Sequence, residues 1–209
     1  MPLRKLNLNY AKVADLTPLA GMPIADLTLS RTEVTTIETL RGMPLVKFSA
    51  SNTSLEDCSP LKDAPLEYLM LKGTSRIADI SFVRGMPIRV LDIGTTKVAN
   101  LTALRGVPLE TFDAENTPIS DIPPIKGAPL KELNIRRCPK LTDYTPVLTL
   151  ARLERLTCDV LPASLLPLRE SATLQSIDAD AYPGEAHTGP RPAAEFWKAY
   201  DAWKARQAK

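Results

Sequence analysis

Apolar and polar positions follow each other along this chain in a unit that returns about every 21 residues. A proline marks the start of each unit, and the steps between successive prolines are 21, 21, 21, 22, 21 and 21 residues. These prolines are Pro2, Pro23, Pro44, Pro65, Pro87, Pro108 and Pro129. Repetition on this scale is typical of solenoids, in which each unit packs mainly against its neighbours. The pattern therefore predicts a solenoid of stacked units.

The first half of each unit has the pattern of a short strand. Counted from the proline as position 1, positions 5 and 7 are apolar and have polar neighbours, as at Leu6 and Leu8 or Leu27 and Leu29. Alternation with period two predicts a strand with one buried face. Equivalent strands of successive units can stack in parallel, about 4.8 Å apart. We therefore expect a parallel sheet with one strand per unit.

The second half of each unit reads V-x-D-L-x-P-L-x-G-M, as in residues 13–22, and is too short for a long helix. The Asp at position 14 and the Pro at position 17 indicate a capped turn or one 3₁₀ turn. The Gly at position 20 suits a backbone with positive φ, and Asp63 replaces it in one unit. An extra residue follows the strand at residues 74–77 and 138–141. We expect local bulges there that leave the next strand in place.

The repeated order L-x-L-x-x-T-x-V-x-D-L-x-P-L-x-G-M-P resembles the leucine-rich repeat of the short bacterial, internalin-like class. Its specific form is similar to repeats attached to bacterial serine/threonine kinases of planctomycete type. Two features depart from the family: Thr is the usual residue at position 10, where the family usually has Asn, and the G-M-P return is short. The match covers residues 1 to about 150 and fades through about 180.

The resemblance implies an α/β solenoid. This is a leucine-rich-repeat horseshoe with a parallel concave β-sheet, short turns or 3₁₀ segments on its convex side, and a C-terminal capping helix. It also implies a non-catalytic protein–protein interaction module, the recognition or docking part of a larger bacterial signalling protein. The alternative is a structural spacer or a self-assembly element. No kinase motif occurs in the sequence.

The sequence predicts two regions. Residues 1–180 hold about seven clear repeats and one or two degenerate ones, and residues 181–209 hold a loop, expected through Pro192, and a helix. Phe196, Trp197, Tyr200 and Trp203 fall on one side of that helix. We interpret it as the cap that a terminal repeat needs, with a membrane-surface or partner helix as the alternative. The first unit begins in phase at Pro2 without a preceding cap. We therefore expect either a longer parent protein or a partner that covers this unit, with weak self-association through the N-terminal repeat as a further option.

Composition and candidate chemistry point away from catalysis. His187 is the sole histidine, the glycines are spread along the repeats and form no Gly-rich loop, and Asp178, Asp180 and Glu185 lack calcium-loop spacing. We therefore expect no catalytic residues, no metal and no cofactor. A net charge of +2 does not call for nucleic acid. The odd set of Cys58, Cys138 and Cys158 predicts buried free thiols rather than a disulfide framework.

The predicted location and partner follow from the same composition. The sequence contains neither a signal peptide nor an apolar run long enough to span a membrane. Together with the unpaired cysteines, this favours the cytoplasm over secretion. The expected partner is a protein or a peptide.

Two groups of residues are candidates for partner binding. Positions 4, 6 and 8 must face the concave side, and in the middle units they place apolar residues between opposite charges. This group comprises Lys47, Tyr68, Met70, Lys72, Val90, Asp92, Asp113, Glu115, Glu132 and Arg136. Position 19 carries a basic row in five successive units: Arg41, Lys62, Arg84, Arg105 and Lys126. An acidic partner, a phosphorylated segment or a membrane could use the row. The alternatives are neutral variation on the concave face and a solvated rim for the row.

Overall fold

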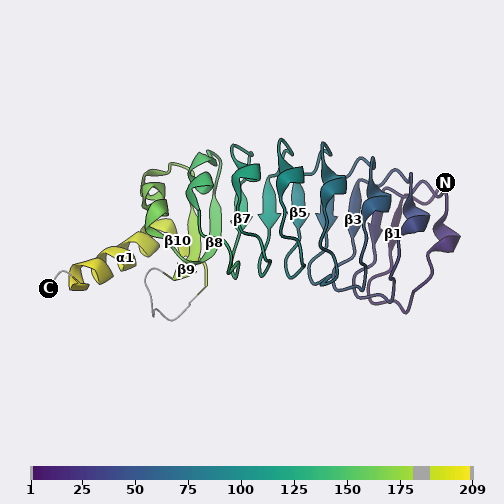
Figure 1. Cartoon of the computed structure of the whole chain (residues 1–209), viewed down its shortest axis with the longest axis horizontal. Coiled ribbons are helices and arrows are strands. Elements are labelled where there is room, and N and C mark those ends of the chain that lie inside the picture. Colours follow the sequence, from purple (N-terminus) through teal and green to yellow (C-terminus); the bar gives the residue numbers. More distant parts are fainter. Residues whose placement is uncertain (1, 181–188, 208–209) are drawn as a thin grey trace.

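The structure is a computed structural model that describes residues 2–180 and 189–207. Ten strands form a single sheet in the order of the chain, so the units stack along one axis (Figure 1). The strands are β1 (Lys5–Asn7), β2 (Asp26–Thr28), β3 (Lys47–Ser49), β4 (Tyr68–Met70), β5 (Val90–Asp92), β6 (Thr111–Asp113), β7 (Glu132–Asn134), β8 (Arg155–Val160), β9 (Ser176–Asp180) and β10 (Arg191–Pro192). The predicted solenoid is confirmed.

Successive strands pair in parallel with equivalent positions side by side. Leu6 pairs with Leu27, and Leu27 pairs with Phe48. The two extra residues do not change the strand register. Leu69 pairs with Leu91 across the first insertion. Equivalent positions of β7 and β8 also pair across the second. The predicted bulges are thus confined to the turn after the strand.

A 3₁₀ turn follows each strand from β1 to β8. These turns are η1 (Thr17–Leu19), η2 (Glu38–Leu40), η3 (Ser59–Leu61), η4 (Ser81–Val83), η5 (Thr102–Leu104), η6 (Pro123–Ile125), η7 (Thr145–Thr149) and η8 (Ala163–Glu170). In η1, Asp15 accepts hydrogen bonds from the backbone N–H of Thr17 at 2.8 Å and from its hydroxyl at 2.7 Å. The predicted single turn is therefore correct, although the aspartate closes an Asx turn one residue earlier than an N-cap would.

Two positions of the unit adopt left-handed backbone. Position 20 does so as predicted, with φ of +69° at both Gly21 and Asp63. Position 9 does so as well, which the sequence did not reveal. Its residues are Tyr10, Arg31, Asn52, Gly73, Thr95, Asn116 and Arg137, with φ between +55° and +74°. Only the glycine and the asparagines among them favour this region.

The core is a continuous, mainly aliphatic column. Buried threonines at position 10 of successive units, hereafter the threonine ladder, line one side of it. Buried Leu27 and Leu29 are typical of positions 5 and 7. Beside them, the hydroxyl of Thr32 donates to the carbonyl oxygen of Leu29 at 2.7 Å. The hydroxyl of Thr74 instead donates at 3.0 Å to Ala50 of the preceding unit. Threonine thus satisfies buried carbonyl groups that would otherwise lack a donor.

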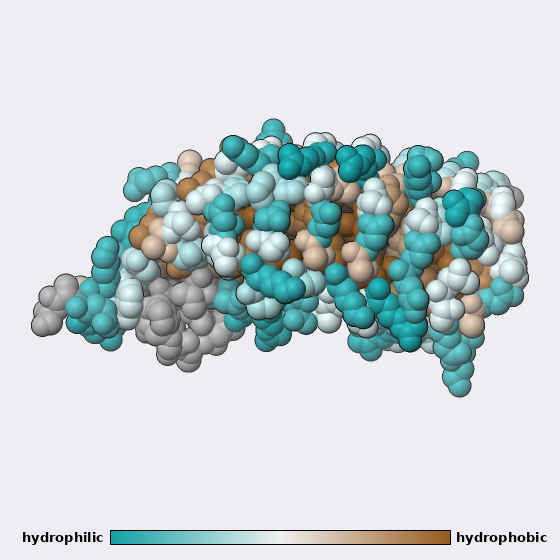
Figure 2. Space-filling view, viewed as in Figure 1, coloured by the Kyte–Doolittle hydropathy of each residue, from teal (hydrophilic) through white to brown (hydrophobic). Residues whose placement is uncertain are grey.

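The three cysteines belong to this core. Cys58, Cys138 and Cys158 are buried and form no disulfide, as predicted. On the face of the molecule shown in Figure 2, polar side chains cover much of the surface, and an apolar band is visible between them.

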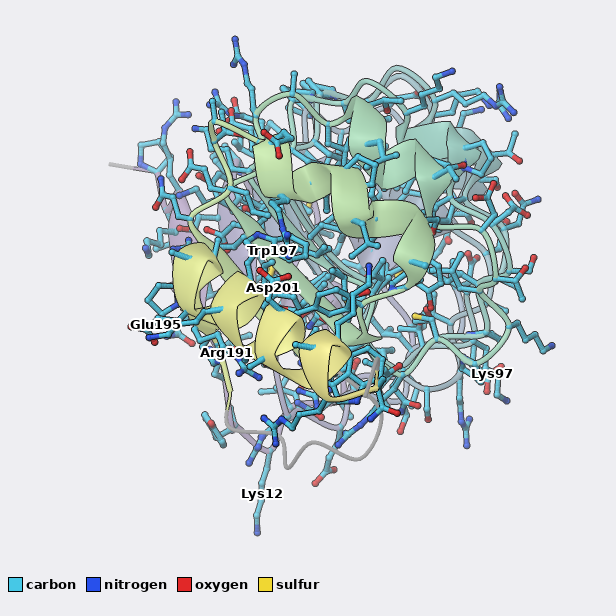
Figure 3. All side chains as sticks on the ribbon, turned by 90° about the vertical axis from the view of Figure 1, so that its left-hand side faces the viewer. Lys12, Lys97, Arg191, Glu195, Trp197 and Asp201 are labelled. Atoms are coloured by element: carbon cyan, nitrogen blue, oxygen red, sulfur yellow. The ribbon has the colours of Figure 1, made fainter. Side chains whose placement is uncertain are left out.

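The C-terminal helix α1 (Ala193–Gln207) closes one end of the solenoid (Figure 3). Phe196 is fully buried and Trp197 nearly so, while Arg169 lies over the Trp197 ring at 5.0 Å and pairs with Asp201 at 2.7 Å. These contacts confirm the predicted cap. Among the described residues, no helix is long and apolar enough to cross a membrane.

The segment that precedes helix α1 differs from what the sequence predicted. The sequence predicted a loop through Pro192, but Arg191–Pro192 forms strand β10 and pairs antiparallel with β9. The pairing continues where the N–H of Ala193 donates to the carbonyl oxygen of Gln175 at 2.9 Å. Glu185 and His187 lie outside the described residues, and the boundary at residue 180 stays a prediction.

The first unit packs on one side only. Leu3 is 48% exposed, and Leu6 and Leu8 are half-buried, whereas the equivalent Leu27 and Leu29 are fully buried. The apolar end expected from the sequence is therefore present.

Candidate partner-binding face

The solvent side of the sheet, hereafter the concave face, presents positions 4, 6 and 8 of each unit. Its first units carry small polar groups that bond to one another. The hydroxyl of Thr28 donates to Asn7 Oδ1 at 2.9 Å, and the hydroxyls of Ser30 and Ser49 lie 2.9 Å apart. At positions 6 and 8 this part of the face offers a partner little charge and little apolar surface, while at position 4 Lys5 and Asp26 form an ion pair at 3.0 Å.

The middle of the concave face holds an apolar centre of Tyr68, Met70 and Val90. All three side chains are half-buried, and Tyr68 pairs in register with Val90 across strands β4 and β5. Lys47 Nζ lies 4.5 Å from the centroid of the Tyr68 ring, within the range of a cation–π interaction. The structure thus brings these four candidate residues together.

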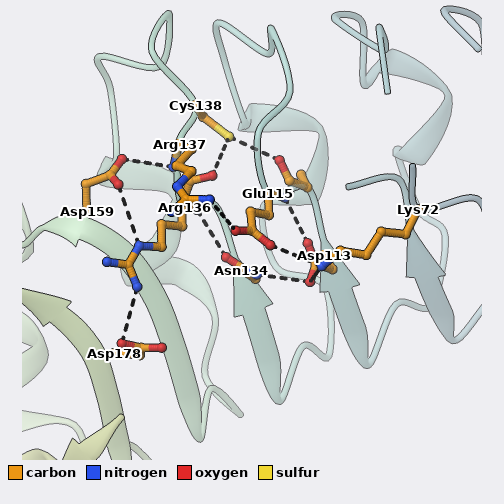
Figure 4. Close-up of polar contacts among 10 residues, drawn as sticks. Lys72, Asp113, Glu115, Asn134, Arg136, Arg137, Cys138, Asp159 and Asp178 are labelled. Carbon is orange, nitrogen blue, oxygen red and sulfur yellow. Dashed lines mark hydrogen bonds and ion pairs between the residues drawn. The ribbon is translucent and has the colours of Figure 1, made fainter. Parts of the chain in front are cut away.

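Lys72 ties the apolar centre to the acidic residues beyond it (Figure 4). Its Nζ lies 3.0 Å from Glu115 Oε2 and 3.9 Å from Asp113 Oδ2. The bridge passes over the intervening unit, where Gly94 occupies position 8 and has no side chain to block it. Burial acts to lower the pKa of Lys72, but the hydrogen bond to Glu115 and the charge of Asp113 raise it above its ordinary value.

Asp92 lies in the floor of the concave face. It is 8% exposed, and its Oδ1 accepts a hydrogen bond from the N–H of Gly94 at 2.9 Å. Burial raises the pKa of Asp92 to about 6, with help from Asp113 and Glu115 and against the effects of Gly94 and Lys72. The alternation of the strand predicted that Asp92 faces solvent, but its carboxylate is largely buried.

Charged groups continue toward the C-terminal end. Arg136 lies 3.8 Å from Asp159 and 3.7 Å from Asp178, and Arg155 forms an ion pair with Glu132. A hollow of about 280 Å³ opens here. Its lining residues are Thr111, Phe112, Asp113, Glu132, Leu133, Asn134, Arg155, Leu156, Thr157, Ser176, Asp178 and Pro190.

The basic row lies at the ends of the 3₁₀ turns, away from the concave face. All five side chains are exposed. Arg41 pairs with Glu38 at 2.6 Å, whereas the other four have no acidic partner within 4 Å in the described part of the chain. The row and the concave face are therefore separate surfaces.

Residues 2–180 and 189–207 contain no group of three histidine, cysteine or acidic side chains arranged to hold a metal ion.

Comparison with solved structures identifies the fold. The crystal structure of an internalin (inlF) from Listeria monocytogenes superposes with a TM-score of 0.78 at 24% identity, covering 85% of this chain and 54% of that one. Internalin C2 (inlC2) from the same species gives 0.71 at 29% identity, covering 75% of this chain and 71% of that one. The chain has the leucine-rich-repeat fold.

This leucine-rich-repeat chain spans about half the length of the first internalin. No protein-family model and no curated protein matches it with significance.

Four residues of this leucine-rich-repeat face were missed in the sequence. Arg155, Asp159, Ser176 and Asp178 lie beyond the last phased proline, so they were not assigned to positions of a unit. The spacing of Leu153, Leu156 and Cys158 repeats the core pattern of the earlier strands. That spacing was sufficient to place Arg155 and Asp159 on the concave face.

Proposed function

We propose that this chain is a non-catalytic protein-binding module that holds a protein or peptide partner on its concave face. One observation carries the proposal: the apolar centre of Tyr68, Met70 and Val90 lies between Lys47 on one side and the Lys72–Glu115 bridge on the other. Aromatic residues and methionine are enriched in the cores of protein interfaces, where a polar rim surrounds them.

The rigidity of the face supports the proposal. Every strand pairs with its neighbours, and Lys72, Glu115 and Asp113 already hold one another in place. Ordering mobile side chains is one of the costs of association. A surface whose charges are positioned beforehand reduces that cost, although each exposed pair itself contributes only about 0–1 kcal/mol of stability.

The arrangement also describes the expected partner. A side chain that fills the apolar centre must be apolar, because Tyr68 and Met70 lie there. Residues toward the acidic end meet Asp113, Glu115 and Glu132, which already pair with Lys72 and Arg155. A Lys or Arg of the partner therefore has to share these acids with the cations of the face. The wider role as the docking part of a larger bacterial signalling protein is a further proposal, which is supported by the resemblance of the repeats.

A quantitative pull-down tests the proposal. The full chain is immobilised as wild type, as Tyr68→Ala/Met70→Ala, and as the matched surface variant Lys12→Ala/Lys97→Ala. Lys12 and Lys97 project away from the body of the molecule (Figure 3). We expect a partner that the first variant loses and the second retains. Equal capture by all three folded proteins contradicts the proposal.

The exposed first unit favours a second candidate function, self-assembly. Leu3 is 48% exposed, and Leu6 and Leu8 are half-buried. A copy of the chain seated there would cover this apolar end. Light scattering at increasing concentration distinguishes the functions: a rise in mass that Leu6→Lys abolishes supports assembly, and a constant monomer mass rules it out.

A further inference from the structure

The basic row has a regular geometry that extends beyond a shared residue type. Arg41, Lys62, Arg84, Arg105 and Lys126 each follow the last residue of a 3₁₀ turn, in η2 to η6. Their φ values lie between −59° and −53° and their ψ values between 119° and 137°. Because the five backbones share one conformation, the five side chains leave their units in the same direction. The turns stack along the solenoid (Figure 1), so these cations form a file.

The charges of this file are largely unneutralised. Lys62, Arg84, Arg105 and Lys126 have no acidic partner within 4 Å in residues 2–180 and 189–207, while Arg41 pairs with Glu38. Asp57 and Asp79, at position 14, accept hydrogen bonds within their own turns. The pKa of Arg41 is raised mainly by Glu38 and also by the charge of Asp57. The file contains five cations in a chain whose net charge is +2, so the rest of the chain is net negative.

Apolar hollows adjoin the cations. One of about 550 Å³ lies between η3 and η4. It is lined by Lys62 and Arg84, by Phe82, Met86 and Pro65, and also by the acidic Asp63. A smaller one of about 230 Å³, between η5 and η6, is lined by Lys126 together with Pro108 and Pro124. Cation and apolar surface therefore alternate along the row.

We infer that the basic row is a second binding surface, and that it takes an acidic polypeptide segment in extended conformation with apolar residues between its acids. Stacked units repeat about every 5 Å at the sheet, and side chains on one side of an extended chain recur about every 7 Å. Long Lys and Arg side chains span that difference. The acids of the segment pair with the cations, and its apolar residues enter the hollows.

The shape and charge of the molecule favour a peptide over a larger polyanion. The cations form a single file, and the remainder of the chain is net negative. A membrane or a nucleic-acid duplex presents a broad anionic surface, which this negative remainder repels. A narrow acidic segment can contact the five cations of the basic row without approaching the negative remainder of the chain.

Fluorescence anisotropy with the full chain tests this inference. The probe is a labelled 16-residue peptide of four Glu-Asp-Leu-Glu units. The variant Lys62→Gln/Arg84→Gln/Arg105→Gln removes three cations of the row. Lys12→Gln/Lys97→Gln/Lys140→Gln removes the same charge from exposed positions elsewhere. Thermal melting confirms that both variants are folded.

We expect saturable binding that weakens with salt, and about a tenfold loss of affinity in the row variant, as expected for three exposed ion pairs. The matched variant should stay within about twofold, and Tyr68→Ala/Met70→Ala should bind the probe as wild type does. Equal loss in both charge variants, absence of binding, or tighter binding to phosphatidylserine vesicles or duplex DNA overturns the inference.

Discussion

Asp92 and Asp113 lie directly opposite each other on strands β5 and β6, with both side chains on the concave face. Like charges in this relationship destabilise a sheet. Asp92 is also buried, and its pKa is raised to about 6 from an ordinary value of 3.8. The folded state therefore takes up a proton on Asp92 more readily than the unfolded state does.

The first prediction is that Asp92→Asn raises the free energy of unfolding at pH 7 by roughly 1 kcal/mol, allowing for solvent screening. Asn keeps the oxygen that accepts the N–H of Gly94 but removes the charge. A raised pKa favours the folded wild type as pH falls through 6 toward 4. The gain of the variant should therefore shrink over that window in urea denaturation. A gain that is the same at pH 7 and pH 5 contradicts the assignment.

The second prediction concerns the threonine ladder. Thr96→Val should lower the free energy of unfolding by about 1–2 kcal/mol, because the Ile93 carbonyl loses the hydroxyl that donates to it at 2.7 Å. Thr96→Ser keeps the hydroxyl and serves as the control. Urea denaturation followed by circular dichroism measures both. A valine variant as stable as the wild type, with the serine variant the less stable of the two, would show that the methyl group matters and the hydrogen bond does not.

The third prediction concerns the left-handed residue at position 9. Thr95 is exposed and β-branched at a φ of +57°, whereas Asn52 and Asn116 occupy the same position in other units. Thr95→Asn should stabilise the chain by about 1 kcal/mol, because asparagine tolerates this conformation better. The exposed control Lys97→Asn should gain nothing. If Thr95→Asn does not raise the denaturation midpoint, the backbone of Thr95 is not strained and the prediction is wrong.

The fourth prediction concerns the cap. Trp197→Ala removes a buried ring and should cost about 3 kcal/mol, whereas exposed Lys198→Ala should change stability by less than about 0.5 kcal/mol. Hydrogen exchange should show protection lost first in β9, which packs against α1. Unchanged exchange in β9 would mean that the helix does not stabilise the last units.

The sequence was sufficient for most of the fold because the repeat fixes the register. Once Leu27 and Phe48 occupy the same position of two units, a parallel stack places them side by side. The positive φ at Asp63 could be predicted in the same way, from the glycines of the other units. The register and the positive φ could both be predicted because the same residue type recurs at the same position of the unit.

Features that no recurring residue type marks escaped the sequence. Tyr10, Arg31 and Thr95 share a left-handed backbone but no residue type, so no pattern marked it. The Lys72–Glu115 bridge joins residues 43 positions apart across an intervening unit, and no sequence pattern marks such a contact. Strand β10 arises from pairing at the sheet edge, and the residues that form it carry no alternation.

The central claim is that a partner contacts the concave face at the apolar centre. Site-specific photo-crosslinking tests it most directly, with benzoylphenylalanine placed at Met70 in one preparation of the 209-residue chain and at Lys97 in another. We predict that a partner captured by the wild type cross-links through position 70 and not through position 97. Equal cross-linking from both positions, or cross-linking from position 97 alone, would contradict the account.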